Sequence, residues 1–285
     1  MTDAMVLCRF LHFTMVLMLF GAWVFKPLLL GRDTALDQSL AFVCRWLVAV
    51  ALISGVGWLL LVTASMAGNW SAASDPSTLH LVLERTFFGQ VWRWHLLINA
   101  LLLLLLLSPL RANRTLQLIL GGLLLATLAP IGHGAMFDGV EGRWLMFNQL
   151  LHLTCVSVWL GGLMLLLLIL RRPDGHSIET LLRKFSGVGY GLVAGLLITG
   201  LINVRALTGA FWPTPLFTGF ALILLIKVSL VGAMLGLALF NRLRINDCEQ
   251  HLPTLRRSVL LEWLLGMGAV AAVSLLGTLP PMISG

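Results

Sequence analysis

The chain has 285 residues, of which 59% are hydrophobic and only 11% carry a charged side chain. Soluble domains carry about 25% charged residues, so the composition excludes an ordinary soluble protein and predicts a membrane protein. The formal net charge is +7, but the basic residues fall in the loops between apolar runs. This placement is typical of membrane orientation and not of nucleic-acid binding. We therefore expect membrane lipid, and no nucleic acid, around this chain.

Eight apolar runs are each long enough to cross a bilayer, which takes about 20 mostly apolar residues in a helix. They are residues 5–30, 40–67, 91–109, 115–131, 145–170, 185–207, 216–243 and 258–279. The runs are too long and continuous for the alternating strands of a membrane β-barrel. We predict an all-α polytopic membrane protein, a bundle of eight transmembrane helices that forms a single domain over residues 1–285.

Most of the 19 lysines and arginines fall in or beside the loops after the first, third, fifth and seventh runs. Cytoplasmic loops carry an excess of Lys and Arg, so these loops are predicted to face the cytoplasm. Both termini are then predicted to lie on the opposite, outer face, because an even number of spans returns the chain to the side where it began.

Residues 132–163 place two of the 7 histidines on either side of a short polar loop. His133 closes the fourth apolar run, and His152 lies about seven residues into the fifth. His12 lies about seven residues into the first run, and His95 four or five residues into the third. Seven residues of helix are roughly 10 Å long. Four spans are thus predicted to bring one imidazole each to the outer third of the membrane.

These histidines are candidates for one shared metal site. Ionisable side chains within a membrane are costly and usually functional, and imidazole is the commonest protein ligand for metals. Nearby Met and Cys residues add soft sulfur donors, and sulfur with imidazole suits copper(I). The predicted metal ligands are His12, His95, His133 and His152, with Met136 and Cys155 as helpers.

Three further polar residues lie within the apolar runs near the predicted site. Asn99 is one turn deeper than His95, and Asn148 is one turn before His152. Either amide can orient an imidazole or simply bond a neighbouring helix. Lys227 is a deep cation in the seventh run, where it either takes part in coupling or extends its stem towards the interface.

Two alternatives remain open at this stage. Pairs of histidines on different helices also ligate haem, so a protein with a single b-type haem would use two of the same residues. The histidines could also be structural and bond only neighbouring helices. The sequence holds no HExxH, Walker or nucleotide-binding glycine-rich motif. We therefore expect no enzymatic activity, although the haem alternative leaves a redox role open.

Three segments of the chain resemble a known family. They are RFLHFTMVLMLFGAWVF around His12, GHGAM around His133, and HLTCVSVWLGGL, which begins at His152 and includes Trp159. Their order and the pattern of eight spans resemble the copper resistance D (CopD/PcoD) family of bacterial inner-membrane proteins. The matching motifs carry a metal-binding role over to His133 and His152, and also to His12 and His95.

The resemblance implies a multi-pass protein of the bacterial cell inner membrane whose outer face is periplasmic. It also implies copper homeostasis or resistance, with copper received from a small periplasmic copper-binding protein of the CopC type. Together with the histidine positions, it predicts a protein that binds copper at a periplasm-facing cluster and transfers or imports it.

Overall fold

A computed structural model describes residues 2–29, 34–131, 137, 139–173, 177–217, 219–244 and 251–279. These residues are largely helical, and the described part of the chain contains no β-strand. Eight helices are long and apolar enough to cross a membrane, which confirms the predicted all-α polytopic fold. They are α1 (Thr2–Leu29), α2 (Thr34–Ala67), α4 (Phe87–Leu107), α5 (Arg114–Ala126, continued by a 3-10 turn at Ala129–Ile131), α6 (Gly139–Arg171), α7 (Ile178–Thr208), α8 (Gly219–Leu243) and α9 (Leu252–Leu276).

Several helices extend beyond the predicted apolar runs. The largest extension is that of α7, which begins at Ile178 and not at residue 185. Helices α2, α6 and α9 each begin six residues before the predicted run. Hydropathy detects the part of a helix that lies in lipid, whereas polar first turns can be helical outside it. In contrast, α5 ends earlier than predicted, at Ala126, shortly before Pro130.

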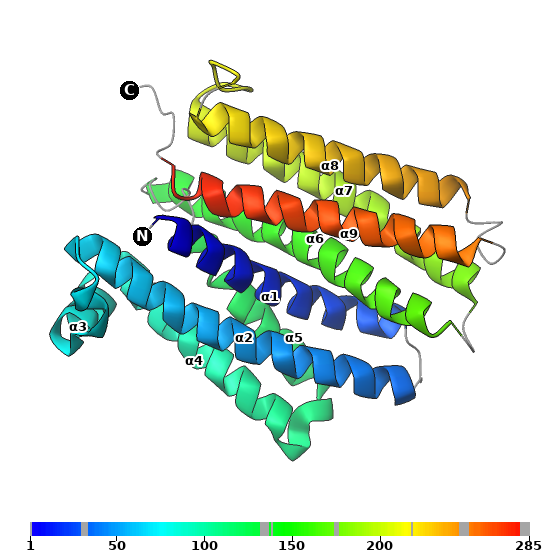
Figure 1. Cartoon of the computed structure of the whole chain (residues 1–285), viewed down its shortest axis with the longest axis horizontal. Helices are drawn as coiled ribbons and strands as arrows, with labels where there is room; N and C mark the ends of the chain where they lie inside the picture. The colour runs from blue at the N-terminus through cyan, green and yellow to red at the C-terminus, as the bar shows by residue number, and fades with distance from the viewer. Residues whose placement is uncertain are drawn as a thin grey trace.

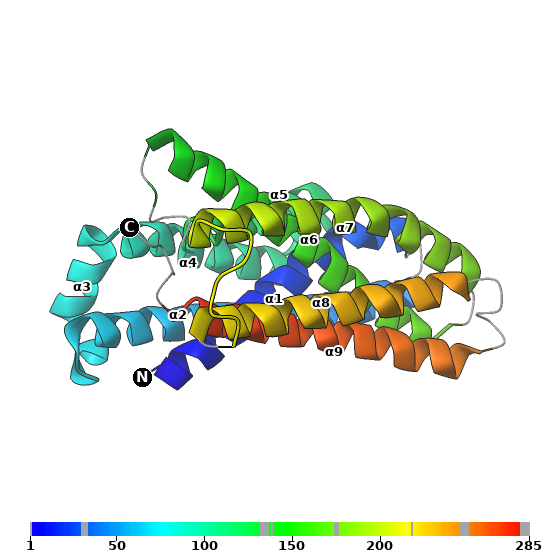
Figure 2. The same ribbon diagram turned by 90° about the horizontal axis from the view of Figure 1, so that it is seen from above.

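A short helix that the sequence analysis did not predict, α3 (Pro76–Arg85), joins α2 to α4. Asp75 caps it by accepting hydrogen bonds from the backbone N–H groups of Ser77 and Thr78, and Pro76 occupies its first turn, where Pro is favoured. Helix α3 lies at one end of the bundle, with the start of α1 and the end of α9 (Figures 1 and 2). We call this the α3 end.

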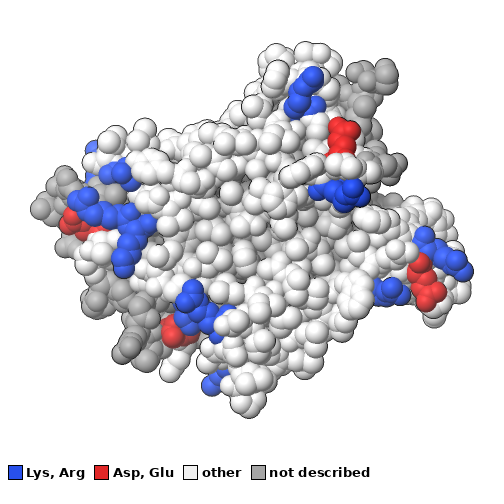
Figure 3. Space-filling model, turned by 180° about the vertical axis from the view of Figure 1, so that it is seen from behind, with Lys and Arg blue, Asp and Glu red and all other residues white. Residues whose placement is uncertain are grey.

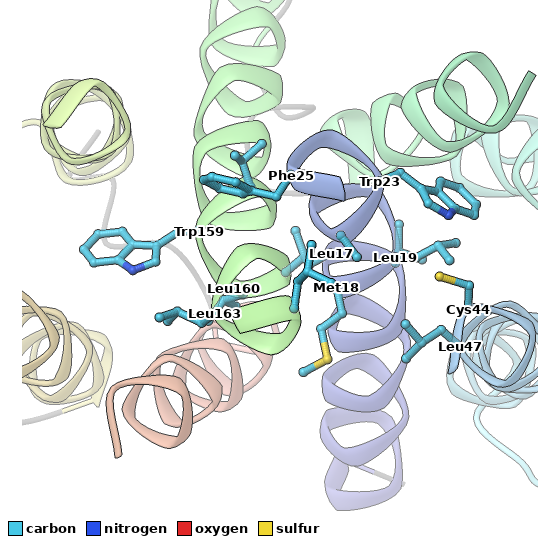
Figure 4. Close-up of a cluster of buried hydrophobic side chains, with 14 of the residues drawn as sticks. Leu17, Met18, Leu19, Trp23, Phe25, Cys44, Leu47, Trp159, Leu160 and Leu163 are labelled. Atoms are coloured by element: carbon cyan, nitrogen blue, oxygen red, sulfur yellow. The ribbon is translucent and has the colours of Figure 1, made fainter. Parts of the chain in front are cut away.

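Helix α1 lies at the centre of the bundle and divides it into two halves. Helices α2, α4 and α5 lie on one side of α1, and α6 to α9 lie on the other (Figure 1). Among the described elements, α1 packs most extensively against α6 and next against α2. Apolar side chains such as Leu17 and Phe25 fill the space between α1 and α6 (Figure 4).

Small residues let α1 and α6 approach each other very closely. A Cβ atom on Gly21 would overlap the carbonyl oxygen of Ser157, and one on Gly161 would overlap the backbone nitrogen of Ala22. At the same level the hydroxyl of Ser157 donates a hydrogen bond of 2.6 Å to the carbonyl oxygen of Leu17. Close approach through small residues, with a polar bond between helices, is how membrane helices associate where water does not drive them together.

Charged side chains mark the two ends of the molecule. On the face seen in Figure 3, lysines, arginines and carboxylates gather at both ends, and a broad uncharged belt lies between them. Large apolar side chains on the outside of the bundle, such as Leu104, Leu201 and Leu261, are exposed accordingly. The belt is what a lipid environment requires of the bundle surface.

We expect Gly161→Leu to destabilise the fold, because the added side chain has no space between α6 and α1. Overpacking of this kind lowers the free energy of unfolding by about 1–3 kcal/mol or more. Thermal unfolding of the detergent-solubilised protein, followed by circular dichroism, measures the effect. Gly232→Leu on α8 is the matched control, because nothing lies within 4 Å of a Cβ atom placed there. Equal melting temperatures for the two variants would contradict the assigned contact.

Candidate metal centre

Two of the predicted histidines meet in the half of the bundle formed by α1, α2, α4 and α5. The Nε2 atom of His12 on α1 lies 2.9 Å from the Nε2 atom of His95 on α4. Both side chains are fully buried. We call these two residues the histidine pair.

The ring of His12 is oriented by groups of α2. Its Nδ1 atom lies 3.0 Å from the carbonyl oxygen of Ala51 and 3.1 Å from the hydroxyl oxygen of Ser54. A carbonyl oxygen can only accept, and the hydroxyl of Ser54 already donates to the carbonyl oxygen of Val50 at 2.7 Å. The hydrogen therefore lies on Nδ1 of His12, and in the neutral ring Nε2 presents a lone pair to His95.

The ring of His95 is held in the same way by α5 and the turn that follows it. Its Nδ1 atom lies 2.7 Å from the hydroxyl oxygen of Thr127, and that hydroxyl donates to the carbonyl oxygen of Leu124 at 2.7 Å. Nδ1 of His95 is then the donor, and its Nε2 atom also presents a lone pair. Two lone pairs facing each other at 2.9 Å repel unless a cation lies between them.

The competing arrangement needs only a rotation of one hydroxyl. If Thr127 donates to Nδ1 of His95, the hydrogen of that ring lies on Nε2 and is donated to His12. The two neutral rings are then joined by an ordinary hydrogen bond, and the carbonyl oxygen of Leu124 no longer accepts a hydrogen bond from the hydroxyl of Thr127. The metal-binding arrangement has the ring hydrogen of His95 on Nδ1, whereas the structural arrangement has it on Nε2.

Aromatic side chains enclose the histidine pair. The indole of Trp92 stacks on His95 with ring centroids 4.4 Å apart and an angle of 7° between the planes. Its N–H donates to the carbonyl oxygen of Gly55 at 2.9 Å, which ties α4 to α2. Trp58 lies edge-on to His12 at 5.8 Å. Gly55 leaves room for the His12 ring, because a Cβ atom there would lie 3.2 Å from Cε1. The pair is thus rigidly oriented and shielded from bulk water.

A bound ion would require a small separation of the rings. Imidazole–metal bonds are about 2.0–2.1 Å long, so an ion placed between the Nε2 atoms separates them to about 4 Å in a linear arrangement, about 1 Å more than observed. Both Nδ1–H groups would stay bonded to oxygen acceptors. Such outer bonds fix the tautomer and orientation of a ligating imidazole.

The other predicted ligands are not brought to this pair. His133 and Met136 lie outside the described residues. His152 on α6 points towards α7, where its Nδ1 atom bonds the hydroxyl of Thr199 at 2.8 Å. Cys155 also faces α7, since a Cβ atom on Gly195 would lie 2.8 Å from its sulfur. Among the described residues, no group of three or more His, Cys, Asp and Glu side chains could hold a metal ion.

The predicted neighbouring polar residues form contacts between helices. With its amide oriented to satisfy its surroundings, Asn99 donates to the carbonyl oxygen of Val48 at 3.3 Å and accepts from the N–H of Leu52 at 3.1 Å. It thus bonds the backbone of α2 and not the ring of His95. Asn148 donates to the carbonyl oxygen of Thr199 and to the side chain of Asn203.

Lys227 lines a cavity of about 190 Å³ among α1, α6, α7, α8 and α9, together with His152. The structure therefore places these two residues in one site, separate from the histidine pair. Those predicted ligands and neighbours that the structure describes are distributed over both halves of the bundle.

Three residues that orient the histidine pair, Ser54, Thr127 and Trp92, were not predicted from the sequence. The hydroxyl groups stand in apolar runs, but Ser and Thr are frequent there as packing residues. Trp92 precedes His95 by three residues and so shares its helix face. That spacing is the one feature of the sequence that indicates the stacking of Trp92 on His95.

The chain matches two family models, one described as the N-terminal domain of copper resistance protein D-like proteins (residues 1–144) and one as copper resistance protein D (residues 179–276). It is 30% identical to the inner membrane protein YebZ of Escherichia coli over 96% of this chain and 97% of that protein. It is also 27% identical to copper resistance protein D of Pseudomonas syringae over 96% of this chain and 95% of that protein.

A further relative is the copper transport protein CutJ of Bacillus subtilis, which is 28% identical over 76% of this chain and 41% of that protein. No solved structure matches the chain. The two family matches fall on the two halves of the bundle: the first contains the histidine pair, and the second contains most of α7, α8 and α9. The chain therefore belongs to the copper resistance protein D family.

Proposed function

We propose that this protein handles copper at a bacterial inner membrane and binds one copper ion between the Nε2 atoms of His12 and His95. The observation that carries the proposal is the pair of Nε2 atoms 2.9 Å apart, each ring having its Nδ1 atom held by oxygen atoms. Copper is the bound cargo in this proposal, and the protein supplies two neutral ligands.

Copper fits this pair better than other metals that imidazole binds. Imidazole suits zinc, copper, iron and nickel, but two ligands in a fully buried site provide neither extra donors nor negative charge. Copper(I) accepts linear coordination by two ligands, and a single charge costs less to bury than a double one. Membership of the copper resistance protein D family and the names of two relatives support the same metal.

The site favours binding and transfer over catalysis. The rings touch directly and are enclosed by Trp58 and Trp92, an arrangement that does not favour insertion of a haem between them. Copper then enters and leaves by exchange of imidazole ligands, with no covalent chemistry at the protein. His133 and Met136 are further candidates for ligands along the route, whereas His152 and Cys155 face α7 on the other side of α1.

The proposed donor is a periplasmic copper-binding protein of the CopC type that approaches the α3 end. His12 lies ten residues from the start of α1 at Thr2, which is about 15 Å along the helix. His95 lies eight residues from the start of α4 at Phe87, which is about 12 Å. Both are nearer to the α3 end than to the other end of their helices. The excess of basic residues at the opposite end supports a periplasmic α3 end, and a relative is named an inner membrane protein.

His12→Ala and His95→Ala should each abolish stoichiometric copper binding while leaving the helical content unchanged. Elemental analysis and competition with a chromogenic copper(I) chelator measure binding by the purified protein. His80→Ala is the matched control, because His80 is an exposed residue of α3 paired with Glu84. Full copper binding in both variants would refute the site, and a Soret band in the wild-type spectrum would restore the haem alternative.

Thr127→Val should weaken copper binding about 10–100-fold, the usual effect of losing an outer partner of a metal-bound imidazole. The substitution keeps the shape of the side chain but removes the acceptor of Nδ1–H of His95. Thr63→Val is the control, since Thr63 is a buried threonine whose hydroxyl donates within its own helix to the carbonyl oxygen of Leu59. An unchanged copper affinity in Thr127→Val would favour the structural hydrogen bond between the rings.

A further inference from the structure

The half of the bundle formed by α6 to α9 contains two cavities that meet at one side chain. The outer cavity, of about 190 Å³, reaches helix ends at Leu207 and Leu276 on the side of the α3 end. The inner cavity, also of about 190 Å³, reaches Leu182 and Arg242 at the opposite end. Of the described residues, Trp159 alone lines both cavities. It projects from α6 away from α1 and towards α7 and α8 (Figure 4).

A buried carboxylate lies beside this tryptophan. Glu262 of α9 is only 2% exposed and lines the inner cavity. Its Oε1 atom accepts a hydrogen bond of 2.9 Å from the indole N–H of Trp159, and its Oε2 atom accepts one of 3.4 Å from the amide of Asn241. No Lys or Arg among the described residues forms an ion pair with it. An unpaired carboxylate within a membrane is costly and marks ion or proton pathways.

The two cavities together cover most of the bilayer. Lys227 lines the outer cavity, whereas Asn241, on the same helix, lines the inner one. These two residues are 14 positions apart, which is about 21 Å along the helix. The hydrocarbon core of a bilayer is about 30 Å thick. Each cavity has room for several water molecules, so protons could reach Trp159 and Glu262 from either end.

We propose that these two cavities form a proton-transfer path, in which Glu262 takes up and releases the proton and Trp159 separates the outer cavity from the inner one. The proposal does not rest on the copper site, which lies on the other side of α1. A proton from the outer cavity binds an oxygen of the Glu262 carboxylate and later leaves through the inner cavity. No bond other than that O–H bond forms or breaks.

The hydrogen bonds of Glu262 link its protonation to the position of Trp159. Donors face both carboxylate oxygens, so both bonds stabilise the charged form. When the carboxyl group is protonated, the amide of Asn241 can turn and accept the new hydrogen with its oxygen. The indole N–H of Trp159 can only donate, and its bond weakens because it no longer faces a charge. Proton uptake thus loosens the side chain that separates the cavities.

The lining of the cavities favours protons over copper as the transported ion. The described residues of the inner cavity include no His, Cys or Met side chain, so they offer copper(I) no soft ligand. The outer cavity includes His152 and Met234, so the selection against copper lies in the inner cavity. The titratable or charged groups that share the cavities with Glu262 are Tyr190 and Arg242 on the inner side and Arg9, His152 and Lys227 on the outer side.

Proton flux into proteoliposomes tests this proposal. The full-length protein is reconstituted with a trapped pH-sensitive dye, and a potassium gradient with valinomycin imposes a membrane potential, with and without copper(I). We expect flux above that of protein-free vesicles in at least one condition, and a loss of at least tenfold in Glu262→Gln. Glu179→Gln, an exposed carboxylate paired with Arg183, should match the wild type.

Trp159→Phe keeps an aromatic ring but removes the N–H donor, so we expect it to raise the flux. If Glu262→Gln fails to fold, the proton flux of Trp159→Phe still tests the proposed path. The histidine pair, measured on the same preparations, should still bind one copper ion in both variants, which separates failure of the path from failure of the copper site. Wild-type flux equal to that of empty vesicles in both conditions, or unchanged flux in both variants, would overturn the proposal.

Discussion

The close contact between α1 and α6 is the constraint on which the two halves of the bundle depend. In lipid, apolar side chains gain little by leaving their surroundings, so helices associate through packing and polar bonds. Gly21 and Gly161 remove the side chains that would hold α1 and α6 apart, and the hydroxyl of Ser157 adds a bond across the gap. Helix α1 is thereby fixed in the centre, and each of its faces can serve a different half of the protein.

The position of α1 explains why the described histidines of the predicted site divide between two places, with His12 and His95 on one side and His152 on the other. The side of α1 that carries His12 faces α2 and α4, where Ala51, Ser54 and His95 meet it. Helix α6 packs against α1 from the other direction, so a residue of α6 that points away from α1 faces α7 and α8. His152 and Trp159 do so. Equal depth in the membrane therefore does not bring side chains together, because each helix presents its residues in a direction that its neighbours determine.

The fold was predictable because its signal is averaged over many residues. A run such as 40–67 is apolar throughout, and an error at one position does not change the assignment. The amphipathic helix α3 was missed because it is short and lies in a polar stretch. The candidate site was less predictable, because depth can be counted along a span whereas rotation and neighbours cannot. His12 and His95 were identified as candidates, but their direct contact depends on how α1 and α4 pack, and the roles of Ser54 and Thr127 depend on the same packing.

The rigid contact between α1 and α6 also limits how the two halves can influence each other. Placing an ion between His12 and His95 requires their Nε2 atoms to separate by about 1 Å, given imidazole–metal bonds of about 2 Å. Trp92 and the bonds to α2 hold the rings, so part of that displacement would be taken up by α1. Because the backbones of α1 and α6 are in direct contact at Gly21 and Gly161, a displacement of α1 would also displace α6. Helix α6 carries Trp159. Closely packed helices shift by discrete amounts and do not deform continuously. Copper binding on one side of α1 and the Trp159–Glu262 bond on the other would then be coupled through the backbone contact of α1 with α6.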